Sequence, residues 1–335
     1  MPAVTSETPW RLLALAPLDL EVWKALLGEL PLDVAVPTER TQAAVAAAIG
    51  EAEIVVGDWT GALRLTEDVV AAAPRLAFVQ QPSVGVDTLD VDALAAVGVP
   101  AANAAGANAV SVAEWCVGAS YAVLRWLAWA DARVREGQWP QLEISRRGGG
   151  ELAGRRVGIV GMGQIGVECA RRYAASGADV AHWSRRERSP EEAGGARWLP
   201  LDELLAHSQL LVVVIALTPE TRGLISAERL ALMPEGSYVV NAARGGLVDE
   251  DALLEAVRSG RLAGAALDVY ATEPLPADSP LRAEDRILLS PHAGGATREA
   301  QGRLIAAVVD NVRRAVSGEP VEHVVNGVDP LVRRR

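Results

Sequence analysis

The stretch 156–186 constrains the fold of this chain more strongly than any other part of the sequence. It opens with the β-branched apolar run 157–160, which predicts a buried strand, and the turn GMGQIG follows at once. Residues 167–175 favour a helix, and residues 178–183 predict a second strand. A strand, a glycine turn, a helix and a strand within about thirty residues are typical of a dinucleotide-binding unit.

Each glycine of this turn has a separate physical task. Gly161 permits a tight turn out of the strand, Gly163 lets a pyrophosphate approach the backbone, and Gly166 lets helix and strand pack closely. The helix N-terminus that follows offers free N–H groups and the positive end of its dipole to the phosphates. The flanking strand and helix favour dinucleotide binding over a structural turn without a ligand.

The end of the second strand bears on which dinucleotide is bound. A carboxylate about 20 residues after the glycines normally binds the ribose 2′-hydroxyl of NAD. Here Ser184 stands where that acid is expected, and Arg185 and Arg186 follow it. Guanidinium groups and serine can donate hydrogen bonds to a 2′-phosphate, so the sequence favours NADP(H) over NAD(H). A solvated arginine loop without a ligand is the alternative, and it leaves the missing acid unexplained.

Length, composition and charge restrict the class of protein, its partners and its cellular compartment. The length of 335 residues suggests two domains, and the net charge of −11 argues against nucleic acid or an acidic membrane surface as the main partner. Cys116 and Cys169 lack metal-ligand spacing, so we expect buried thiols and no metal. We find neither a signal-peptide pattern nor an apolar run long enough to span a bilayer, and we expect a cytoplasmic protein.

Residues 11–103 alternate short apolar strands with helices, which predicts a parallel-sheet domain without a glycine fingerprint of its own. The loop 81–87 follows the fourth strand, where ligands of parallel sheets bind, and an ordinary turn explains it equally well. Residues 103–108 form a candidate hinge. A long apolar helical region rich in tryptophan follows over 110–136, and its aromatic side chains pack either in the core or against a second subunit.

Polar and charged residues recur just past the strands predicted after residue 186, and such strand ends meet along one crevice in a doubly wound sheet. Arg244, Glu273 and His292 lie at such positions, and each alone could be an ordinary surface or turn residue. Of the four histidines, His292 is the one in a Pro-His-x-Gly-Gly turn that opens a helix. It is therefore the best candidate for acid–base chemistry.

Three strings in this half of the chain carry a resemblance to a known family. They read VNAARGGLVDEDAL, ALDVYATEPLPADSPL and LSPHAGGATREA. In order and spacing, together with GMGQIG, they resemble the NAD(P)-dependent D-isomer-specific 2-hydroxyacid dehydrogenase family, and the match covers nearly the whole chain. The resemblance implies an α/β protein of two Rossmann-like doubly wound parallel-sheet domains with a cleft between them, and a homodimer through the cofactor domain.

The resemblance also implies a division of the chain and a set of roles. Residues 1–103, completed by 292–335, would bind the substrate, and residues 104–291 would bind the dinucleotide. Arg244 would bind the substrate carboxylate and carbonyl, and His292 would protonate the carbonyl oxygen as hydride arrives. Glu273 would hydrogen-bond His292, raise its pKa and fix its orientation.

Further contacts follow from the resemblance position by position. The expected cofactor contacts are Gly161, Gly163, Gln164, Ile165, Gly166, Ser184, Arg185, Arg186, Thr218, Pro219, Ala242, Ala243, Asp268 and Gly294. The amides of Val84 and Gly85 would bind the substrate carboxylate, together with Arg244 and His292. Asp268 would lie near the carboxamide of the nicotinamide.

The loop 83–87 is similar to that of the glyoxylate and hydroxypyruvate reductases, which suggests a small 2-oxo acid as substrate. A 3-phosphoglycerate-type or another 2-hydroxyacid dehydrogenase is the alternative. A non-catalytic dinucleotide-sensing protein is a third possibility, against which the intact set of Arg244, Glu273 and His292 argues. Trp115 stands where many relatives have histidine, and this departure bears on the substrate assignment.

Overall fold

The structure is a computed structural model that describes residues 8–335, and the described chain forms two compact units. Unit 1 contains the chain up to Asn108 together with Arg298–Arg335, and unit 2 contains Ala109–Thr297. Both changes of unit fall at the first residue of a long helix, α5 (Ala109–Leu124) and α12 (Arg298–Ser317). Residues 104–108 therefore group with unit 1 and residues 292–297 with unit 2, unlike the predicted boundaries at 103/104 and 291/292.

Unit 1 is built on a five-stranded parallel sheet in the order β2-β1-β3-β4-β5. Its strands are β1 (Trp10–Ala14), β2 (Leu32–Ala35), β3 (Ile54–Val56), β4 (Phe78–Gln80) and β5 (Ala101–Ala102). Its other helices are α1 (Leu20–Leu27), α2 (Gln42–Ala48), α3 (Glu67–Ala71) and α4 (Val91–Ala96).

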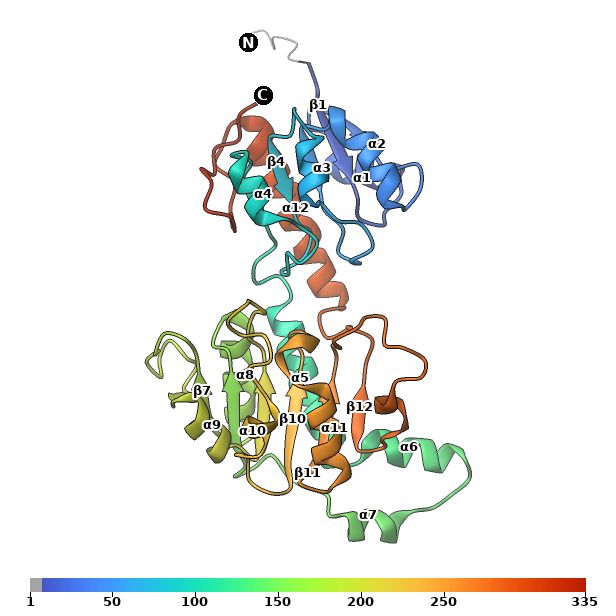
Figure 1. Cartoon of the computed structure of the whole chain (residues 1–335), viewed down its shortest axis with the longest axis vertical. Helices are drawn as coiled ribbons and strands as arrows, with labels where there is room; N and C mark the ends of the chain where they lie inside the picture. The colour runs from blue at the N-terminus through green and yellow to red at the C-terminus, as the bar shows by residue number, and fades with distance from the viewer. Residues whose placement is uncertain (1–7) are drawn as a thin grey trace. The chain divides into compact units, whose positions relative to one another are not determined.

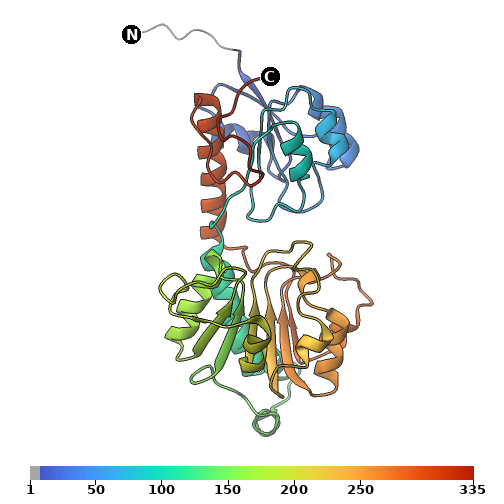
Figure 2. The ribbon, with the colours of Figure 1, turned by 60° about the vertical axis from the view of Figure 1, so that its left-hand side comes forward.

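Alternate residues of the central strands of unit 1 pack on opposite faces of the sheet, since side chains along a strand point alternately to either side. Leu13 and Val55 belong to the apolar cluster that α2, α3 and α4 cover. Leu12 and Ile54 belong to the cluster that α1 and α12 cover. Helix α12 runs along this side of the sheet (Figure 2), so helices bury both faces.

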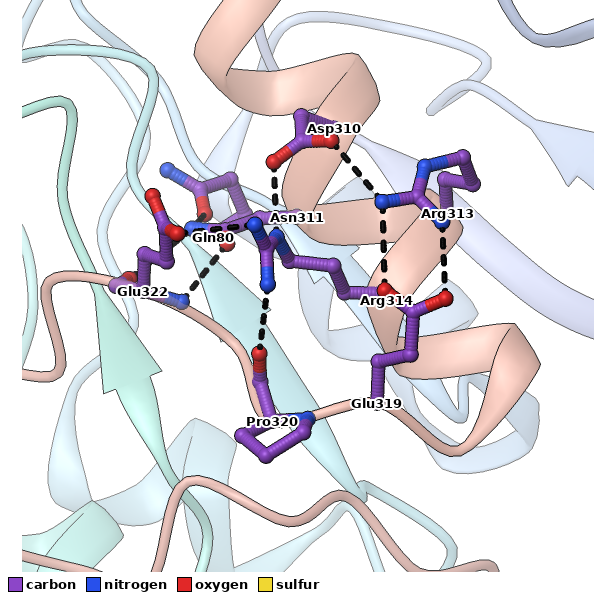
Figure 3. Close-up of polar contacts among 8 residues, drawn as sticks. All are labelled: Gln80, Asp310, Asn311, Arg313, Arg314, Glu319, Pro320 and Glu322. Atoms are coloured by element: carbon purple, nitrogen blue, oxygen red, sulfur yellow. Dashed lines mark hydrogen bonds and ion pairs between the residues drawn. The ribbon is translucent and has the colours of Figure 1, made fainter.

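A buried asparagine fastens α12 to the sheet and to the chain that follows the helix (Figure 3). The side-chain amide of Asn311 donates to Gln80 Oε1 at 2.7 Å and to the carbonyl oxygen of Glu322 at 3.0 Å. Its Oδ1 accepts from the N–H of Glu322 at 2.8 Å. Because Asn311 is 2% exposed, these bonds replace those that its polar atoms would make with water.

Unit 2 is built on a seven-stranded parallel sheet in the order β12-β11-β10-β9-β6-β7-β8. Its strands are β6 (Arg156–Val160), β7 (Asp179–Trp183), β8 (Arg197–Trp198), β9 (Leu210–Val213), β10 (Ser237–Asn241), β11 (Leu262–Leu267) and β12 (Ile287–Leu289). Its helices besides α5 are α6 (Leu127–Arg135), α7 (Gln141–Arg147), α8 (Gln164–Ala175), α9 (Leu201–His207), α10 (Ala227–Leu230) and α11 (Glu250–Arg258).

Helices cover both faces of this sheet as well. Helices α5 and α8 pack on the face that contains Val157 and Ile159, and α9, α10 and α11 pack on the face that contains Val160. Figure 1 shows α10 and α11 in front of the sheet and α5 behind it. The strand order runs outward from β6 in both directions, so the carboxyl ends of β6 and β9 flank the point where ligands of doubly wound sheets bind. The predicted class of two Rossmann-like parallel-sheet domains is confirmed.

The apolar region predicted as one helix over 110–136 is two helices, α5 and α6. Trp126 adopts a left-handed backbone conformation with φ of 58°, which interrupts the helical hydrogen bonding between them. Its ring lies edge-on to Trp129 with centroids 6.5 Å apart. The guanidinium carbon of Arg147 lies 4.8 Å from the centroid of the Trp126 ring and 4.3 Å from that of the Trp129 ring. Both indole rings are buried within unit 2, and this aromatic contact stabilises the break. Among residues 8–335, none of the helices combines the length and apolar character needed to span a bilayer.

Candidate active site

Two of the three glycines after β6 are required by the packing of the protein itself. Gly161 has a φ of +104°, and a Cβ atom there would lie 2.7 Å from the backbone of Ile215, two residues after β9. A Cβ atom on Gly166 would lie 2.1 Å from the carbonyl oxygen of Gly161. Any side chain at either position would push the turn away from the sheet.

Gly163 is different, because a Cβ atom at this position would meet no protein atom within 4 Å. It is the N-cap of α8 and supplies no side-chain cap to the helix. The N–H groups of the first turn, which begin at Gln164 and Ile165, have no acceptor within the helix and form the positive end of its dipole. The residues present therefore fit a pyrophosphate group, as the sequence predicts.

The loop after β7 holds the three residues predicted to contact a 2′-phosphate. The hydroxyl of Ser184 donates to the carbonyl oxygen of Arg186 at 2.7 Å, and Arg186 pairs with Glu192 at 2.9 Å. Arg185 is exposed, and its guanidinium has no hydrogen bond or ion pair within the part of the chain that the structure describes. Of the three, Arg185 therefore keeps its donors available.

The predicted adenosine segment lies near this loop. The hydroxyl of Thr218 donates to Glu220 at 2.7 Å and lowers the pKa of that carboxyl group, and the charge of Arg185 lowers it further. Arg185 and the segment of Thr218 and Pro219 thus lie around one carboxylate. Sequence reasoning missed Glu220, which would compete with a bound phosphate for Arg185.

The centre of the predicted acid–base site is a contact between two loops of unit 2. His292 Nδ1 donates to Glu273 Oε2 at 2.7 Å, and the other oxygen of Glu273 accepts from the N–H of Tyr270 at 3.0 Å. Partial burial alone would raise the pKa of Glu273. The hydrogen bonds from His292 and Tyr270 and the charges of His292 and Arg244 outweigh burial and lower the pKa. The carboxyl group is therefore ionised near neutral pH and orients the imidazole.

Arg244 lies on the neighbouring loop after β10. Gly245 makes this proximity possible, because a Cβ atom there would lie 1.9 Å from the carbonyl carbon of Tyr270. Buried Asn241 shapes the turn: its amide donates to the carbonyl oxygen of Arg244 at 3.0 Å, and its Oδ1 accepts from the N–H of Ala243 at 3.1 Å. The loops that carry Arg244 and Glu273 are thus in direct contact.

Asp268 holds the loop of His292 in place. Its carboxylate is 2% exposed and accepts hydrogen bonds from the hydroxyl of Ser290, from Ala293 N–H at 2.7 Å and from Gly294 N–H at 2.8 Å. His292 itself has a positive φ of 54°, and its N–H donates to the carbonyl oxygen of Asp268 at 2.8 Å. A left-handed conformation in a residue other than glycine persists only where its surroundings fix it, as Asp268 does here.

The positioning role of Asp268 was missed by sequence reasoning, which assigned it to the cofactor. The pattern that could have indicated this role is an aspartate directly after a buried strand, with a Pro-His-x-Gly-Gly turn directly after the next strand. Trp115 of α5 also reaches this region, since a Cβ atom on Gly294 would lie 3.4 Å from its ring and 2.8 Å from Asp268 Oδ2. Trp115, which stands where many relatives have histidine, therefore lies against the loop of His292.

Two carbonyl groups of the loop 81–87 in unit 1 accept hydrogen bonds from nearby side chains. Asn103 donates to the carbonyl oxygen of Val84 at 2.7 Å, and the hydroxyl of Ser83 donates to that of Gly85 at 2.8 Å. The N–H groups of Val84 and Gly85 have no acceptor among the described residues. Two adjacent free N–H groups in a turn can bind an anion such as a carboxylate.

Comparison with known proteins identifies the family. The model of the D-isomer specific 2-hydroxyacid dehydrogenase NAD binding domain matches residues 117–294, more than half of the chain. This chain belongs to the D-isomer specific 2-hydroxyacid dehydrogenase family. The resemblance to this family that was predicted from the sequence is confirmed.

Relatives within this family have different names and lengths. The chain is 43% identical over 282 residues to a D-3-phosphoglycerate dehydrogenase of Mycobacterium tuberculosis, covering 84% of this chain and 52% of the relative. It is 37% identical over 281 residues to glyoxylate/hydroxypyruvate reductase B of Pectobacterium carotovorum, covering 83% and 87%. The chain thus spans about half the length of the phosphoglycerate dehydrogenases it matches.

A solved dehydrogenase structure has the same fold. The holo D-mandelate dehydrogenase of Rhodotorula graminis superposes with a TM-score of 0.88 at 26% sequence identity, covering 96% of this chain and 99% of that one. Family membership and fold are therefore established from both sequence and structure.

Proposed function

We propose that this 2-hydroxyacid dehydrogenase reduces a small 2-oxo acid such as glyoxylate or hydroxypyruvate. The observation that carries the proposal is the 2.7 Å contact between His292 and Glu273, on a loop that directly adjoins the one with Arg244. A cation, an ionised carboxyl group and an imidazole are the groups needed to bind an acid and to move a proton at its carbonyl oxygen.

Each of the three residues has a distinct role in this proposal. Arg244 binds the carboxylate and the reacting carbonyl oxygen through its planar guanidinium. His292 donates a proton from Nε2 to the carbonyl oxygen, and in the opposite direction accepts it back. Glu273 keeps a proton on Nδ1 and stabilises the charged imidazole. When bound, a reduced nicotinamide dinucleotide supplies the hydride.

The substrate carboxylate receives further hydrogen bonds in our proposal. The free N–H groups of Val84 and Gly85 bind it, while their carbonyl groups are held by Asn103 and Ser83. Backbone donors fixed in this way bind a carboxylate without further ordering, because their direction is set before the ligand arrives.

We also propose that the dinucleotide is NADP(H). The pyrophosphate binds at Gly163, Gln164 and Ile165, where the structure leaves room at the start of α8. The lack of an acid at Ser184 and the available guanidinium of Arg185 support a 2′-phosphate. Ala242, Ala243, Asp268 and Gly294 remain our predicted contacts at the nicotinamide end.

A homodimer through unit 2 is part of the proposal. Four side chains on α6, α7 and their connection are exposed although they are large and apolar: Leu127, Val134, Trp139 and Leu142. Such a surface is typical of a protein interface. Sedimentation equilibrium would measure the mass, and a monomer at micromolar concentration would contradict this part.

Initial rates with glyoxylate and hydroxypyruvate, each with NADPH and with NADH, test the function. We expect oxidation of NADPH, and its loss in His292→Gln while cofactor binding remains. Wild-type turnover in His292→Gln would show that the assigned acid is wrong.

A 3-phosphoglycerate-type dehydrogenase is the second candidate, and the 43% identity to relatives of that name favours it. It predicts that the 3-phosphorylated analogue of hydroxypyruvate is reduced with a higher kcat/KM than hydroxypyruvate itself. The same rate measurements distinguish the two candidates.

A further inference from the structure

Glu250 is a partly buried carboxylate that the proposed reaction does not use, and it lies beside the loop of Glu273. It is the first residue of α11, and its Oε1 accepts a hydrogen bond from the N–H of Ala271. Ala271 directly follows Tyr270, whose N–H donates to the carboxylate of Glu273. Two carboxylates from different parts of unit 2 thus hold two adjacent N–H groups of one loop.

The peptide between Tyr270 and Ala271 is held from two directions. A Cβ atom on Gly245 would lie 1.9 Å from its carbonyl carbon and 2.2 Å from its nitrogen, so this peptide packs directly against the backbone of the Arg244 loop. The N–H of the same peptide donates to Glu250. Because a peptide unit is planar, a hydrogen bond that fixes its N–H also fixes its carbonyl group. The bond to Glu250 therefore keeps the peptide from turning.

Glu250 is itself fixed to the core of unit 2. Helix α11 packs its apolar face against the sheet. The N–H of Asp249, the residue before Glu250, donates to the carbonyl oxygen of Ile225 at 3.0 Å. A side chain on a packed helix is a more precise anchor than one on a loop. The place of Ala271 therefore follows that of the helix.

The charges around Glu250 show that it lies near Glu273. Burial raises the pKa of Glu250, the hydrogen bond from Ala271 lowers it, and the charges of Asp251 and Glu273 raise it. Like charges at short range disfavour each other's ionised form. The hydrogen bond from Ala271 thus holds Glu250 at a place that its charge alone would disfavour.

We propose that Glu250 is a positioning residue for the pair of Glu273 and His292. Its hydrogen bond with Ala271 holds the backbone at Tyr270. The N–H of Tyr270 holds Glu273, which in turn orients the imidazole of His292. The inference rests on the proposed proton transfer by His292 and goes beyond it by naming a residue that acts through Glu273. All of these residues belong to unit 2.

Steady-state rates with glyoxylate and the preferred reduced cofactor test the inference. Glu250→Ala should lower kcat by about tenfold, because small displacements of the reacting groups cost large factors in rate. KM for the cofactor should stay unchanged.

Two conservative variants separate the hydrogen bond from the charge of Glu250. Glu250→Gln should keep most of kcat, because its amide oxygen still accepts from the N–H of Ala271. Glu250→Asp keeps the charge but shortens the side chain, and should lose kcat as Glu250→Ala does.

A double mutant shows whether Glu250 acts through Glu273. In a Glu273→Ala background, the additional change Glu250→Ala should lower kcat by less than about twofold, because the group that Glu250 positions is already absent. A tenfold loss in both backgrounds would mean that the two residues act separately, and would overturn the inference.

Asp278→Ala is the matched control. Asp278 and Glu250 line the same cavity of about 300 Å³, but Asp278 is exposed and has no hydrogen bond or ion pair among residues 8–335. The substitution removes an acidic side chain from this cavity and should leave kcat unchanged.

The outcomes separate this inference from the function on which it rests. Wild-type kcat in both Glu250→Ala and Glu250→Asp overturns the positioning role alone. A larger loss in Glu250→Gln than in Glu250→Asp also overturns it, since the charge would then matter more than the hydrogen bond. Failure of the wild type to reduce any 2-oxo acid overturns the proposed function together with the inference.

Discussion

His292 Nδ1 and Glu273 Oε2 lie 2.7 Å apart, although the two residues belong to different loops of unit 2. The remaining oxygen of Glu273 is held by the N–H of Tyr270, so neither residue of the pair can turn without breaking a hydrogen bond. The pair leaves Nε2 as the imidazole atom available for a proton transfer.

Replacing Glu273 with Gln should lower kcat about a hundredfold, because the amide does not stabilise a charged imidazole. Steady-state rates across pH 4–9 would measure this. The pKa of Glu273 lies below its usual value of 4.5, so the wild-type carboxylate should stay ionised as the pH falls, until the pH passes through that lowered pKa. Glu255→Gln, exposed on α11, is the control. A Glu273→Gln enzyme with the kcat of the wild type would contradict the assignment.

Asp268→Asn should destabilise unit 2 and lower kcat together. The substitution removes a carboxylate that accepts three hydrogen bonds from the loop of His292, and a buried unsatisfied group costs about 1–3 kcal/mol. Urea unfolding gives the free energy, and steady-state rates give kcat. Exposed Asp278→Asn should change neither. Unaltered stability in Asp268→Asn would mean that the loop does not depend on this carboxylate.

Arg185→Ala tests the choice of cofactor. We expect KM for NADPH to rise by about tenfold or more, because a charge-assisted hydrogen bond to the 2′-phosphate is lost, while KM for NADH changes little. Arg171→Ala on the surface of α8 is the control, since Arg171 pairs with neighbouring Glu168 on the same helix. An equal rise in KM for NADPH and for NADH would disprove the role of Arg185.

His182 should make the fold sensitive to acid. It lies buried on β7, and burial lowers the pKa of its imidazole below 6.5. As the pH falls below 6.5 the unfolded chain therefore binds more protons at this position than the folded chain, and stability falls by up to about 1.4 kcal/mol per pH unit. Denaturant unfolding at pH 7.5 and 5.5 should show a smaller loss for His182→Phe than for the wild type. His207, whose pKa burial also lowers, contributes equally to both proteins. The same loss in both proteins would refute the prediction.

Asn311→Ala should lower the free energy of unfolding by about 2 kcal/mol or more, because Gln80 and Glu322 lose their buried partner. Arg313→Ala on the same helix removes exposed pairs with Glu319 and Asp310 and should cost less than about 1 kcal/mol. Thermal or urea unfolding distinguishes the two. Equal effects would indicate that Asn311 contributes no more than a surface residue.

The sequence was sufficient for features that depend on local pattern. The turn GMGQIG and its flanking strands form as predicted, since glycine spacing and apolar runs encode β6, α8 and β7 directly. The candidate residues Glu273 and His292 follow predicted strands and meet, because parallel strand ends share one edge of a sheet.

Features that depend on distant partners could not be predicted in this way. Strands β5 and β8 have two residues each, too few for a periodic signal. The break at Trp126 depends on contacts with Trp129 and Arg147, and the role of Asp268 depends on N–H groups 25 and 26 residues further along the chain. Tertiary contacts of this kind override local preference.

The absence of a side chain at Gly245 has a mechanical consequence. With backbone pressed against backbone at Tyr270, the arginine segment and the glutamate segment cannot slide past each other independently. Any shift of one segment therefore moves the other segment and, through the carboxylate of Glu273, the imidazole of His292. A mutation far from the three side chains that displaces either segment would therefore disturb all of them at once, so this part of the protein should tolerate insertions poorly.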